Sequence, residues 1–255
     1  SMFDRLLSMG MEYQFLAEQY RMHPKICVFP SWRFYRSELK SGVRESDRSF
    51  PKGIPLRAPL AFVHVDGSEW SGGVSKKNTS EAACVAWLAE QFLQALPYHP
   101  TGDEVGIITP YAAQVSEIRR MLPQRVRSLA QVSSVDGFQG CEKEFILLSL
   151  VRANQHGAVG FVSDWRRLNV AITRARRACV LVGHLPTWLD AENALLRDWI
   201  SFHSGNSVDF LTYSTRSLVP LPPSLKHMVE ALQQEFQRNK PAAAALPRIS
   251  TAARD

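Results

Sequence analysis

The sequence lacks the paired cysteines that a zinc site or a disulfide framework requires. Its four cysteines, Cys27, Cys84, Cys141 and Cys179, are far apart, and no CxxC pair or histidine cluster accompanies them. This spacing favours a reducing compartment and predicts no metal site. The chain also has no apolar run of roughly 18 residues, the length of a membrane span, and its first residues do not resemble a signal peptide. We therefore expect no membrane partner and a cytoplasmic location, with the nucleus as the alternative.

The sequence also lacks the motifs with which many enzymes hold a nucleotide. No GxxxxGK[ST] loop is present to cradle phosphates and to bind Mg²⁺ through a hydroxyl. No Asp-Glu pair stands at the end of an apolar strand, where a metal-holding carboxylate and a base are needed. The motif GxGxxG is absent as well, which argues against a dinucleotide-dependent metabolic enzyme of doubly wound fold.

The composition of the chain is that of a globular protein with a basic balance. Its 255 residues suffice for one large domain or two small ones, and 45% of them are hydrophobic, which allows a full core. The formal net charge of +6 permits a polyanionic partner but does not require one.

Apolar runs and helical patterns alternate along most of the chain. Runs suited to buried parallel strands are Leu60–Val65, Val105–Thr109, Phe145–Val151 and Ala178–Gly183. Helical patterns cover Ser80–Leu96, Tyr111–Leu122, Asp164–Arg176 and Asp190–Phe202. A further helix starts near Pro24 and is interrupted at Pro30. This alternation predicts an α/β fold with a mostly parallel sheet flanked by helices.

We expect one domain over residues 1–212 and a C-terminal extension over residues 213–255. Within the domain, residues 36–59 are polar, charged and rich in Gly and Pro, which predicts an irregular surface excursion. The extension contains a proline-rich stretch, a short amphipathic piece over Ser224–Gln237 and a tail rich in Ala and Pro. We expect this extension to be partly mobile.

The segment DWRRLNVAITRARR, which begins at Asp164, carries five arginines. At roughly 100° per residue its apolar side chains form a narrow stripe, and Arg167 and Arg174 share one flank of that stripe. A planar guanidinium donates two parallel hydrogen bonds and keeps its charge, which suits a fixed phosphate or carboxylate. The pattern predicts a helix that is anchored on one side and presents arginines to an anion, with a solvated basic face as the alternative.

Two further segments carry groups that suit a nucleotide. In LAEQYRMHP, Tyr20 offers an aromatic face for stacking a base, and Arg21 offers a guanidinium beside it. In VDGFQGCEKEF, Gly137 and Gly140 allow the backbone to approach a ligand closely. Glu142 precedes a buried strand, where we expect ligands of an open α/β sheet to bind, and its carboxylate can accept a hydrogen bond from a ribose hydroxyl. A glycine-rich turn with a solvated glutamate is the alternative.

A fourth segment, GIITPYAAQ, suits the backbone of a nucleic acid. The strand ends at Thr109, Pro110 stops it, and a helix begins directly afterwards. The hydroxyl of Thr109 and the free amides at the start of the helix are suited to bind one backbone phosphate. The alternative is a plain strand–turn–helix junction in which Thr109 acts as a local cap.

Taken together and in this order, these segments resemble the motifs of a known motor family. QYRMHP, ITPY, SVDGFQGCEKEF followed by LSLVRAN, and RRLNVAITRAR are similar to the second motor domain of superfamily 1 helicases. The likeness is to the class that contains the nonsense-mediated-decay helicase, the regulator of nonsense transcripts, and it covers about Phe3 to Gly183. It implies a RecA-like domain of the P-loop-NTPase type without its own P-loop. Cys141 departs from the family, which commonly has Arg there, as does Gly137, where Ala is usual.

The resemblance implies a role for each residue that matches a motif. Arg21 and Arg174 are expected to reach the γ-phosphate of ATP as arginine fingers, which stabilise the charge on the transferring group. Tyr20 is expected to stack on the adenine and Glu142 to contact the ribose. Other motif residues are expected to line the nucleic-acid track: Thr109, Pro110, Ser134, Arg152 and Asn154. The resemblance further implies that Gln139 couples the two sites, and Arg167 is expected to support Arg174 or to make a second contact.

The same resemblance implies the C-terminal half of an ATP-dependent RNA or DNA helicase that moves 5′ to 3′. ATP and Mg²⁺ are expected to bind mainly through a first RecA-like domain of the same protein, so that this chain alone is inactive. The other expected partners are single-stranded RNA or DNA and RNA-decay or processing factors. The alternative is a motor-like module that binds nucleic acid or protein without hydrolysing ATP, but the presence of Arg21, Glu142 and Arg174 favours the enzyme.

Overall fold

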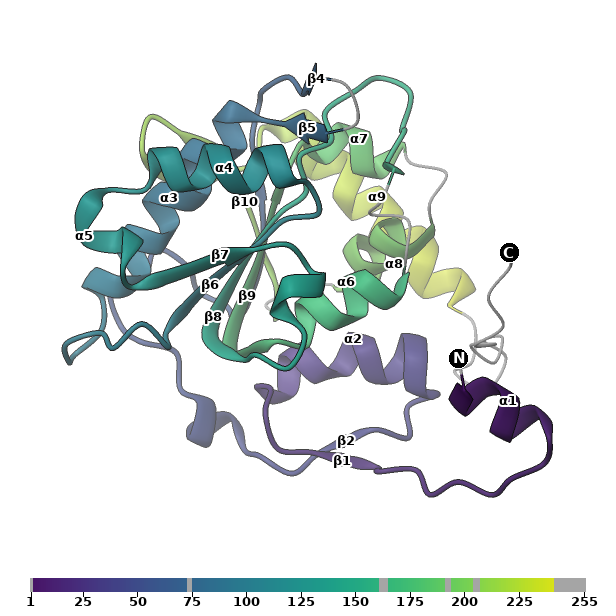
Figure 1. Cartoon of the computed structure of the whole chain (residues 1–255). Helices are drawn as coiled ribbons and strands as arrows, with labels where there is room; N and C mark the ends of the chain where they lie inside the picture. The colour runs from purple at the N-terminus through teal and green to yellow at the C-terminus, as the bar shows by residue number, and fades with distance from the viewer. Residues whose placement is uncertain (1, 73–74, 161–164, 191–193, 204–206, 241–255) are drawn as a thin grey trace.

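The centre of the molecule is a seven-stranded sheet with helices on both faces (Figure 1). The computed structural model describes residues 2–72, 75–160, 165–190, 194–203 and 207–240. In spatial order the strands are β11 (Ser217–Pro220), β10 (Asp209–Ser214), β3 (Leu60–His64), β9 (Ala175–Gly183), β8 (Lys143–Ser149), β6 (Val105–Ile108) and β7 (Ala130–Ser133). Neighbouring strands are parallel except β10 and β11, which are antiparallel. The expected α/β fold with a mostly parallel sheet is therefore confirmed.

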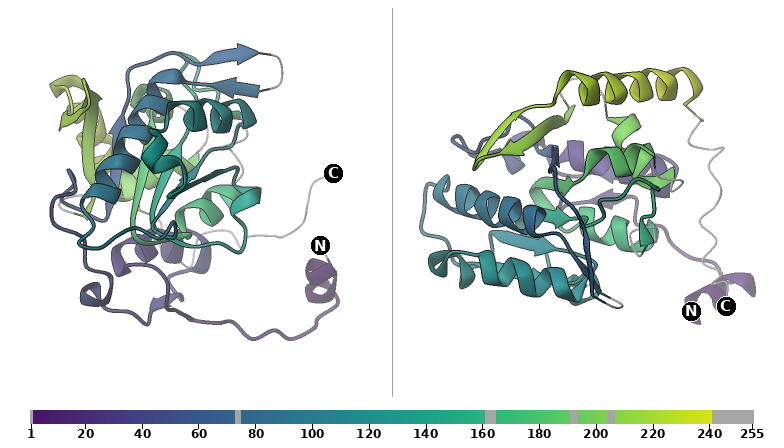
Figure 2. Two further views of the ribbon diagram at one scale, coloured as in Figure 1. Left: turned by 60° about the vertical axis from the view of Figure 1, so that its left-hand side comes forward. Right: turned by 90° about the horizontal axis from the view of Figure 1, so that it is seen from above.

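Helices lie on both faces of the sheet (Figure 2), and each face has its own hydrophobic core. One face is covered by α3 (Thr79–Gln94), α4 (Ala112–Met121) and α5 (Gln124–Arg127). The other face is covered by α2 (Pro24–Tyr35), α6 (Trp165–Ile172), α7 (Leu185–Leu189), α8 (Ala194–Phe202) and α9 (Pro223–Asn239). Strand β3 contributes to both cores, because its alternate side chains point to opposite faces. Its continuous apolar run is typical of a parallel strand that is buried on both sides.

The remaining elements are short and lie outside the main sheet. They are α1 (Met2–Ser8), β1 (Glu18–Gln19), β2 (Lys40–Ser41), the 3-10 turn η1 (Glu45–Arg48), β4 (Trp70–Gly72), β5 (Ser75–Lys77) and the 3-10 turn η2 (Asp136–Phe138). β1 pairs with β2 in parallel, and β4 pairs with β5 as an antiparallel hairpin. The segment over residues 36–59 thus contains one two-residue strand and one 3-10 turn.

The helix over residues 24–35 continues through Pro30, so the expected interruption at this proline was wrong. A proline inside a helix costs about 3 kcal/mol because it removes a hydrogen bond and its ring meets a carbonyl. Packing compensates for this cost, since Phe29 and Trp32 on either side of Pro30 are buried in the core. The His23 side chain also accepts a hydrogen bond from the amide of Lys25 at the first turn, with an N–N distance of 3.1 Å.

The C-terminal segment continues the sheet beyond the expected domain boundary. The boundary after residue 212 falls inside β10, and β11 extends the same sheet at its edge. α9 then packs against α8, where the side-chain amide of Gln233 donates to the carbonyl of Ile200 at 3.3 Å. Residues 241–255 of the expected mobile extension lie outside the described residues.

The four strands expected in the centre of the sheet all form, whereas the edge strand β7 was missed. β7 has only four residues, of which Ala130 and Val132 are buried and the two between and after them are half-buried. This alternation is the signal of an edge strand, but it is too short to stand out. In the described part of the chain, no helix is both long and apolar enough to cross a membrane.

Candidate functional site

The expected site residues fall into two groups at opposite ends of the sheet. Glu142 stands directly before β8, and Arg174 stands directly before β9. Pro110, Ser134 and Arg152, in contrast, follow the carboxyl ends of β6, β7 and β8. Because these strands are parallel, the first group lies at the amino end of the sheet and the second at its carboxyl end.

At the amino end, Arg21 and Glu142 form an ion pair. Nε of Arg21 donates to Oε2 of Glu142 at 2.5 Å, and its Nη1 donates to the carbonyl of Thr173 at 3.2 Å. The hydrogen bond from Arg21 is the main reason why the pKa of Glu142 lies below its ordinary value. Both side chains are partly exposed, by 33% and 43%, so solvent screens the pair and a ligand can reach it.

Arg174 lies beside this pair and is held by neutral oxygens. Its Nε donates to the carbonyl of Val170 at 3.0 Å, and its other nitrogens approach Thr173 Oγ1 and the carbonyl of Cys141 at 3.3 and 3.5 Å. Burial, and next the positive charge of Arg21, lower the pKa of Arg174. Arg174 remains protonated because guanidinium pKa values lie far above neutral pH. Two guanidiniums therefore share one nearby carboxylate, an arrangement that attracts an anion.

The backbone at Arg21 is held from two sides. Oε1 of Gln19 accepts hydrogen bonds from the amides of Arg21 and Met22 at 3.0 and 2.6 Å. On the other side, Nε of Arg48 donates to the carbonyl of Arg21 at 2.7 Å. The amide of His23 also donates to the carbonyl of Arg176 in β9 at 2.7 Å, which joins this segment to the sheet. Neither Arg48 nor Arg176 could be expected here from the sequence, since both contacts depend on the tertiary fold.

Tyr20 is exposed beside this cluster and lies against a glycine. Its side chain is 62% exposed, and its hydroxyl donates to Oε2 of Glu18 at 2.6 Å. A Cβ atom at Gly42 would fall 2.3 Å from the Tyr20 ring, so only glycine permits this ring position. The ring is thus positioned by its neighbours and remains accessible for stacking.

Two expectations about this end of the site were wrong. The arginine segment is not one helix, because α6 ends at Ile172 and β9 begins at Ala175, where it pairs with Lys143 of β8. Arg174 therefore lies in the turn and does not share a helix flank with Arg167. Glu142 does not lie at the carboxyl end of the sheet, where open α/β sheets usually bind ligands. β7 and β8 are parallel, so the loop between them must return to the amino end before β8 starts. Asp164 lies outside the described residues.

At the carboxyl end, Thr109 does not reach the surface. Its side chain is fully buried, and its hydroxyl has no hydrogen-bond partner in the described structure. Its amide donates to the carbonyl of Ser133 at 3.2 Å, which ties β6 to β7. Ser134 is half-buried, and its hydroxyl accepts a hydrogen bond from the amide of Gly137 at 3.3 Å. Of these residues, Pro110 and Ser134 are the ones that a ligand can contact through side chains.

Arg152 and Asn154 make internal contacts with Glu69, which precedes the β4–β5 hairpin. Nε of Arg152 donates to Oε2 of Glu69 at 2.8 Å, and the side-chain amide of Asn154 donates to the same oxygen at 3.3 Å. The amide of Ala153 adds a third hydrogen bond at 2.8 Å. The side chains of Arg152 and Glu69 are 8% and 13% exposed. This geometry explains both residues as supports of the loop after β8 and does not favour direct contacts with a nucleic acid.

The stability of the fold should depend on pH through Glu69. Partial burial raises the pKa of Glu69, but hydrogen bonds from Arg152, Ala153, Asn154 and Lys76 outweigh it and lower the pKa from 4.5 to about 2. Since the folded-state pKa is depressed, this stabilisation is complete above the unfolded pKa and is lost as the pH falls from about 4.5 towards about 2. Over this window we expect a loss of about 2–3 kcal/mol.

Urea unfolding at pH 5.0, 4.0 and 3.0, on the chain and on a Glu69→Gln variant, tests this dependence. The neutral amide cannot titrate. As the pH decreases, the free energy of unfolding should therefore fall less steeply in the variant than in the parent chain. Other carboxylates titrate equally in both proteins and cancel in the comparison. Parallel profiles for the two proteins would contradict the assignment.

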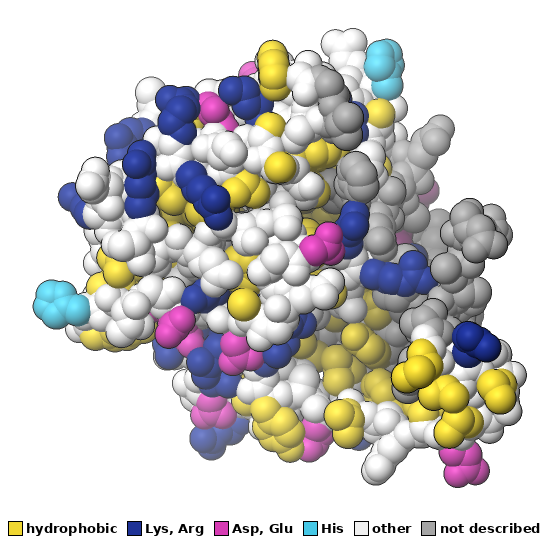
Figure 3. Space-filling model, in the orientation of Figure 1, with side chains coloured by type: hydrophobic (Ala, Val, Ile, Leu, Met, Phe, Trp, Pro, Cys, Tyr) yellow, Lys and Arg dark blue, Asp and Glu magenta, His cyan; other side chains and the backbone are white. Residues whose placement is uncertain are grey.

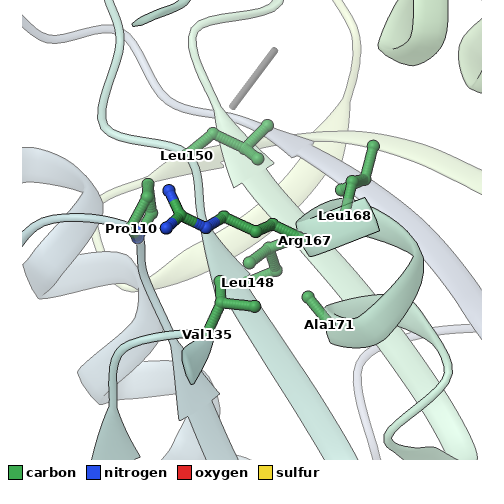
Figure 4. A pocket seen from close by; sticks show the side chains of 7 residues that line it. All are labelled: Pro110, Val135, Leu148, Leu150, Arg167, Leu168 and Ala171. Atoms are coloured by element: carbon green, nitrogen blue, oxygen red, sulfur yellow. The ribbon is translucent and has the colours of Figure 1, made fainter. Parts of the chain in front are cut away.

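Arg167 lies at the carboxyl end, in a small apolar pocket (Figure 4). Its side chain extends across the pocket towards Pro110, and its Nη2 lies 3.4 Å from Oδ2 of Asp136. The other residues that line the pocket are Val135, Leu148, Leu150, Leu168 and Ala171. Because α6 begins near Arg167 and its last residue is two positions before Arg174, this helix connects the two ends of the sheet.

The loop of residues 134–142 is a second connection between the two ends. It leaves the carboxyl end of β7 at Ser134 and reaches the amino end of β8 at Glu142. Gln139 lies on this loop, is exposed, and donates its amide hydrogen to the carbonyl of Asp136 at 3.2 Å. The expected coupling residues Gln139 and Arg167 thus both lie on segments that join the two groups.

The surface charge differs between two parts of the view in Figure 3. Basic and acidic side chains are intermixed near the lower end of the sheet, above β1 and β2, whereas mostly basic side chains cover α3, α4 and α5 at the upper left. The described residues hold no group of three or more side chains suited to bind a metal ion.

Comparisons with known proteins identify relatives over most of the chain. A family described as an AAA domain matches residues 1–186. The chain is 40% identical over 196 residues to the "Regulator of nonsense transcripts 1 homolog" of Arabidopsis thaliana, which covers 72% of this chain and 15% of the relative. It is 39% identical over 199 residues to the "ATP-dependent helicase upf1" of Schizosaccharomyces pombe, with 72% and 21% covered.

A third relative matches a larger share of the chain. The "DNA polymerase alpha-associated DNA helicase A" of Saccharomyces cerevisiae is 31% identical over 229 residues, which cover 81% of this chain and 33% of the relative. The chain therefore spans a third or less of the length of these three relatives.

Proposed function

The chain belongs to the AAA domain family, among the superfamily 1 helicases of the nonsense-mediated-decay class, and on this premise we propose that it is the second motor domain of an ATP-dependent RNA or DNA helicase. The observation that carries the proposal is the convergence of Arg21 and Arg174 beside Glu142. Two guanidiniums with one partly exposed carboxylate leave an excess of positive charge, which suits the terminal phosphate of a nucleotide.

In this proposal each residue of the cluster acts on ATP that is bound mainly by a first motor domain. Arg174 and Arg21 donate hydrogen bonds to the γ-phosphate oxygens and stabilise the charge that develops during transfer. Tyr20 stacks on the adenine, and Glu142 accepts a hydrogen bond from the ribose. Mg²⁺ neutralises charge on the phosphates when it is bound, and by the family resemblance we assign its ligands to the first motor domain.

At the opposite end of the sheet, Pro110 and Ser134 are proposed to contact the nucleic acid. Both follow carboxyl ends of strands, and both are partly accessible. In this proposal ATP binds in a cleft between the two motor domains. Opening and closing of this cleft moves the loop with Gln139 and the helix with Arg167, and these movements change the contacts with nucleic acid at the carboxyl end. Arg152 and Asn154 contribute indirectly, because they hold the loop after β8 through Glu69.

The chain by itself should show no ATPase activity, because it contains the arginines but no phosphate-binding loop. We expect ATP hydrolysis at background level and only weak ATP affinity for the purified 255-residue chain, with or without RNA. A coupled phosphate-release assay and a fluorescent ATP analogue measure the two quantities, with the full-length protein as the positive control. Turnover by the isolated chain would overturn the proposal of a half-motor.

Movement from 5′ to 3′ and the choice between RNA and DNA form a separate part of the proposal. A strand-displacement assay of the full-length protein on matched RNA and DNA duplexes with 5′ or 3′ tails tests both. We expect unwinding from 5′ tails only. A protein that binds these substrates but neither unwinds them nor hydrolyses ATP would instead be a nucleic-acid-binding module.

A further inference from the structure

Arg176, the second residue of β9, has a buried N–H group without a hydrogen-bond partner. Its Nη1 forms an ion pair with Oε1 of Glu144 at 2.9 Å, but its Nε is buried and unsatisfied in the described structure. Oε1 of Glu142 faces this Nε at 3.8 Å, which is beyond hydrogen-bond distance. A buried charged donor without an acceptor is unfavourable, so the geometry favours a second state in which an acceptor arrives.

Glu142 lies between two guanidiniums that differ in how firmly they are held. Its Oε2 bonds to Arg21 at 2.5 Å, while its Oε1 needs to move by about 1 Å to reach Arg176 at the usual charge-assisted distance. The backbone of Arg176 is fixed in β9, where its carbonyl accepts from the amide of His23. The guanidinium of Arg176 is also anchored to a second carboxylate, Glu144, whereas Glu142 is the one carboxylate paired with Arg21 among the described ion pairs. Arg21 is therefore the partner that can leave.

We propose that Arg176 is a positioning residue that receives the carboxylate of Glu142 when Arg21 turns to the γ-phosphate, an inference that rests on the function proposed above. In the structure, Glu142 neutralises Arg21 and would compete with the phosphate for the Arg21 guanidinium. Once Glu142 bonds to Nε of Arg176, the attraction that draws Arg21 back is weakened. The same bond fixes one carboxylate oxygen of Glu142 and leaves the other for a ribose hydroxyl.

Arg177, the next residue, provides a matched control. It forms its ion pair with Glu144, as Arg176 does, and its Nη1 donates to the carbonyl of Ser49 at 3.1 Å. Its exposure is also similar, 30% against 36% for Arg176. Arg177 differs in having no contact with Glu142 among the described ion pairs. A comparison of the two variants thus separates the effect of transferring Glu142 to Arg176 from the effect of losing an ion pair with Glu144.

The experiment is a double-mutant cycle in the full-length protein, with kcat and KM of RNA-stimulated ATP hydrolysis as readouts. Arg176→Gln should lower kcat about 10-fold, the usual effect of one charge-assisted hydrogen bond, whereas Arg177→Gln should stay within about 2-fold of the parent. In a Glu142→Gln background, Arg176→Gln should have no further effect, because a neutral amide neither retains Arg21 nor needs Arg176.

Two outcomes would overturn the inference: equal losses in Arg176→Gln and Arg177→Gln, or the same loss from Arg176→Gln in both backgrounds. The thermal unfolding midpoint of each variant shows whether it folds. If Arg176→Gln does not fold, the cycle is repeated with Arg176→Met, which keeps much of the side-chain length but has no donor for Glu142, and the same criteria apply. A parent protein without ATPase activity would contradict the proposed function itself, while an active parent with an additive cycle would contradict only the transfer of Glu142.

Discussion

Replacing Arg174 with alanine in the full-length protein is expected to reduce ATP hydrolysis by ~10³–10⁵-fold, the range that arginine fingers supply in phosphoryl transfer. Arg174 is the best-prepared donor of the cluster, because its guanidinium is held by three neutral oxygens and shares no direct hydrogen bond with a carboxylate in the described structure. The guanidinium can therefore bind a phosphate without first breaking an ion pair with a carboxylate. Such preorganisation is the main source of electrostatic catalysis.

The same substitution should leave RNA binding within about 3-fold of the parent, since single surface changes away from a contact have small effects. Arg174 lies at the amino end of β9, whereas Pro110 and Ser134 lie beyond the carboxyl ends of their strands. Steady-state ATPase measurements and fluorescence anisotropy of a labelled RNA test the two halves of this prediction. Arg44→Ala is a suitable control, because Arg44 is an exposed arginine paired only locally with Asp47. Undiminished RNA-stimulated ATPase activity in Arg174→Ala would refute the assignment.

The central strands could be predicted from the sequence because their apolar runs are decisive. β3, β6, β8 and β9 are almost completely buried, and short apolar runs of this kind are typical of buried parallel strands. The end of the arginine helix could not be predicted in the same way. Helical periodicity continues past Ile172, but the pairing of Ala175 with Lys143 draws the chain into the sheet. Such long-range pairing overrides local propensity and leaves no short-range signal.

The candidate site was only partly predictable for the same reason. The motif residues identified Arg21, Glu142 and Arg174, and the structure brings these three together. Contacts between segments that are far apart in the sequence could not be predicted. Arg152 was expected beside a nucleic acid, yet its partner is Glu69, 83 residues earlier. Motif spacing can identify which residues belong to the candidate site. A buried ion pair such as that of Arg152 with Glu69 depends on which loops the tertiary fold brings together.

Removing the Glu69 carboxylate by Glu69→Ala should destabilise the chain by about 3–5 kcal/mol, the usual cost when one partner of a buried ion pair is lost. The Arg152 guanidinium is 8% exposed and would remain charged in a site that water hardly reaches. The amide of Ala153 would lose its acceptor at the same time, and the side chain of Asn154 would keep only the carbonyl of Ala158. Because domains are stable by only about 5–15 kcal/mol, the variant should unfold at much lower urea concentration.

A control variant and a double variant separate this explanation from a general effect of truncation. Glu230→Ala removes an exposed carboxylate 3.8 Å from Lys226 and should change the free energy of unfolding by less than about 1 kcal/mol. Changing both partners, Glu69→Leu with Arg152→Met, removes the unpaired charge of Arg152 and should recover the part of the loss that this charge causes. If the double variant is as unstable as Glu69→Ala, the cost arises from the shape of the loop, and the ion pair is not its cause. If it is stable but binds RNA weakly, the charged pair positions the carboxyl end of the sheet for the nucleic acid.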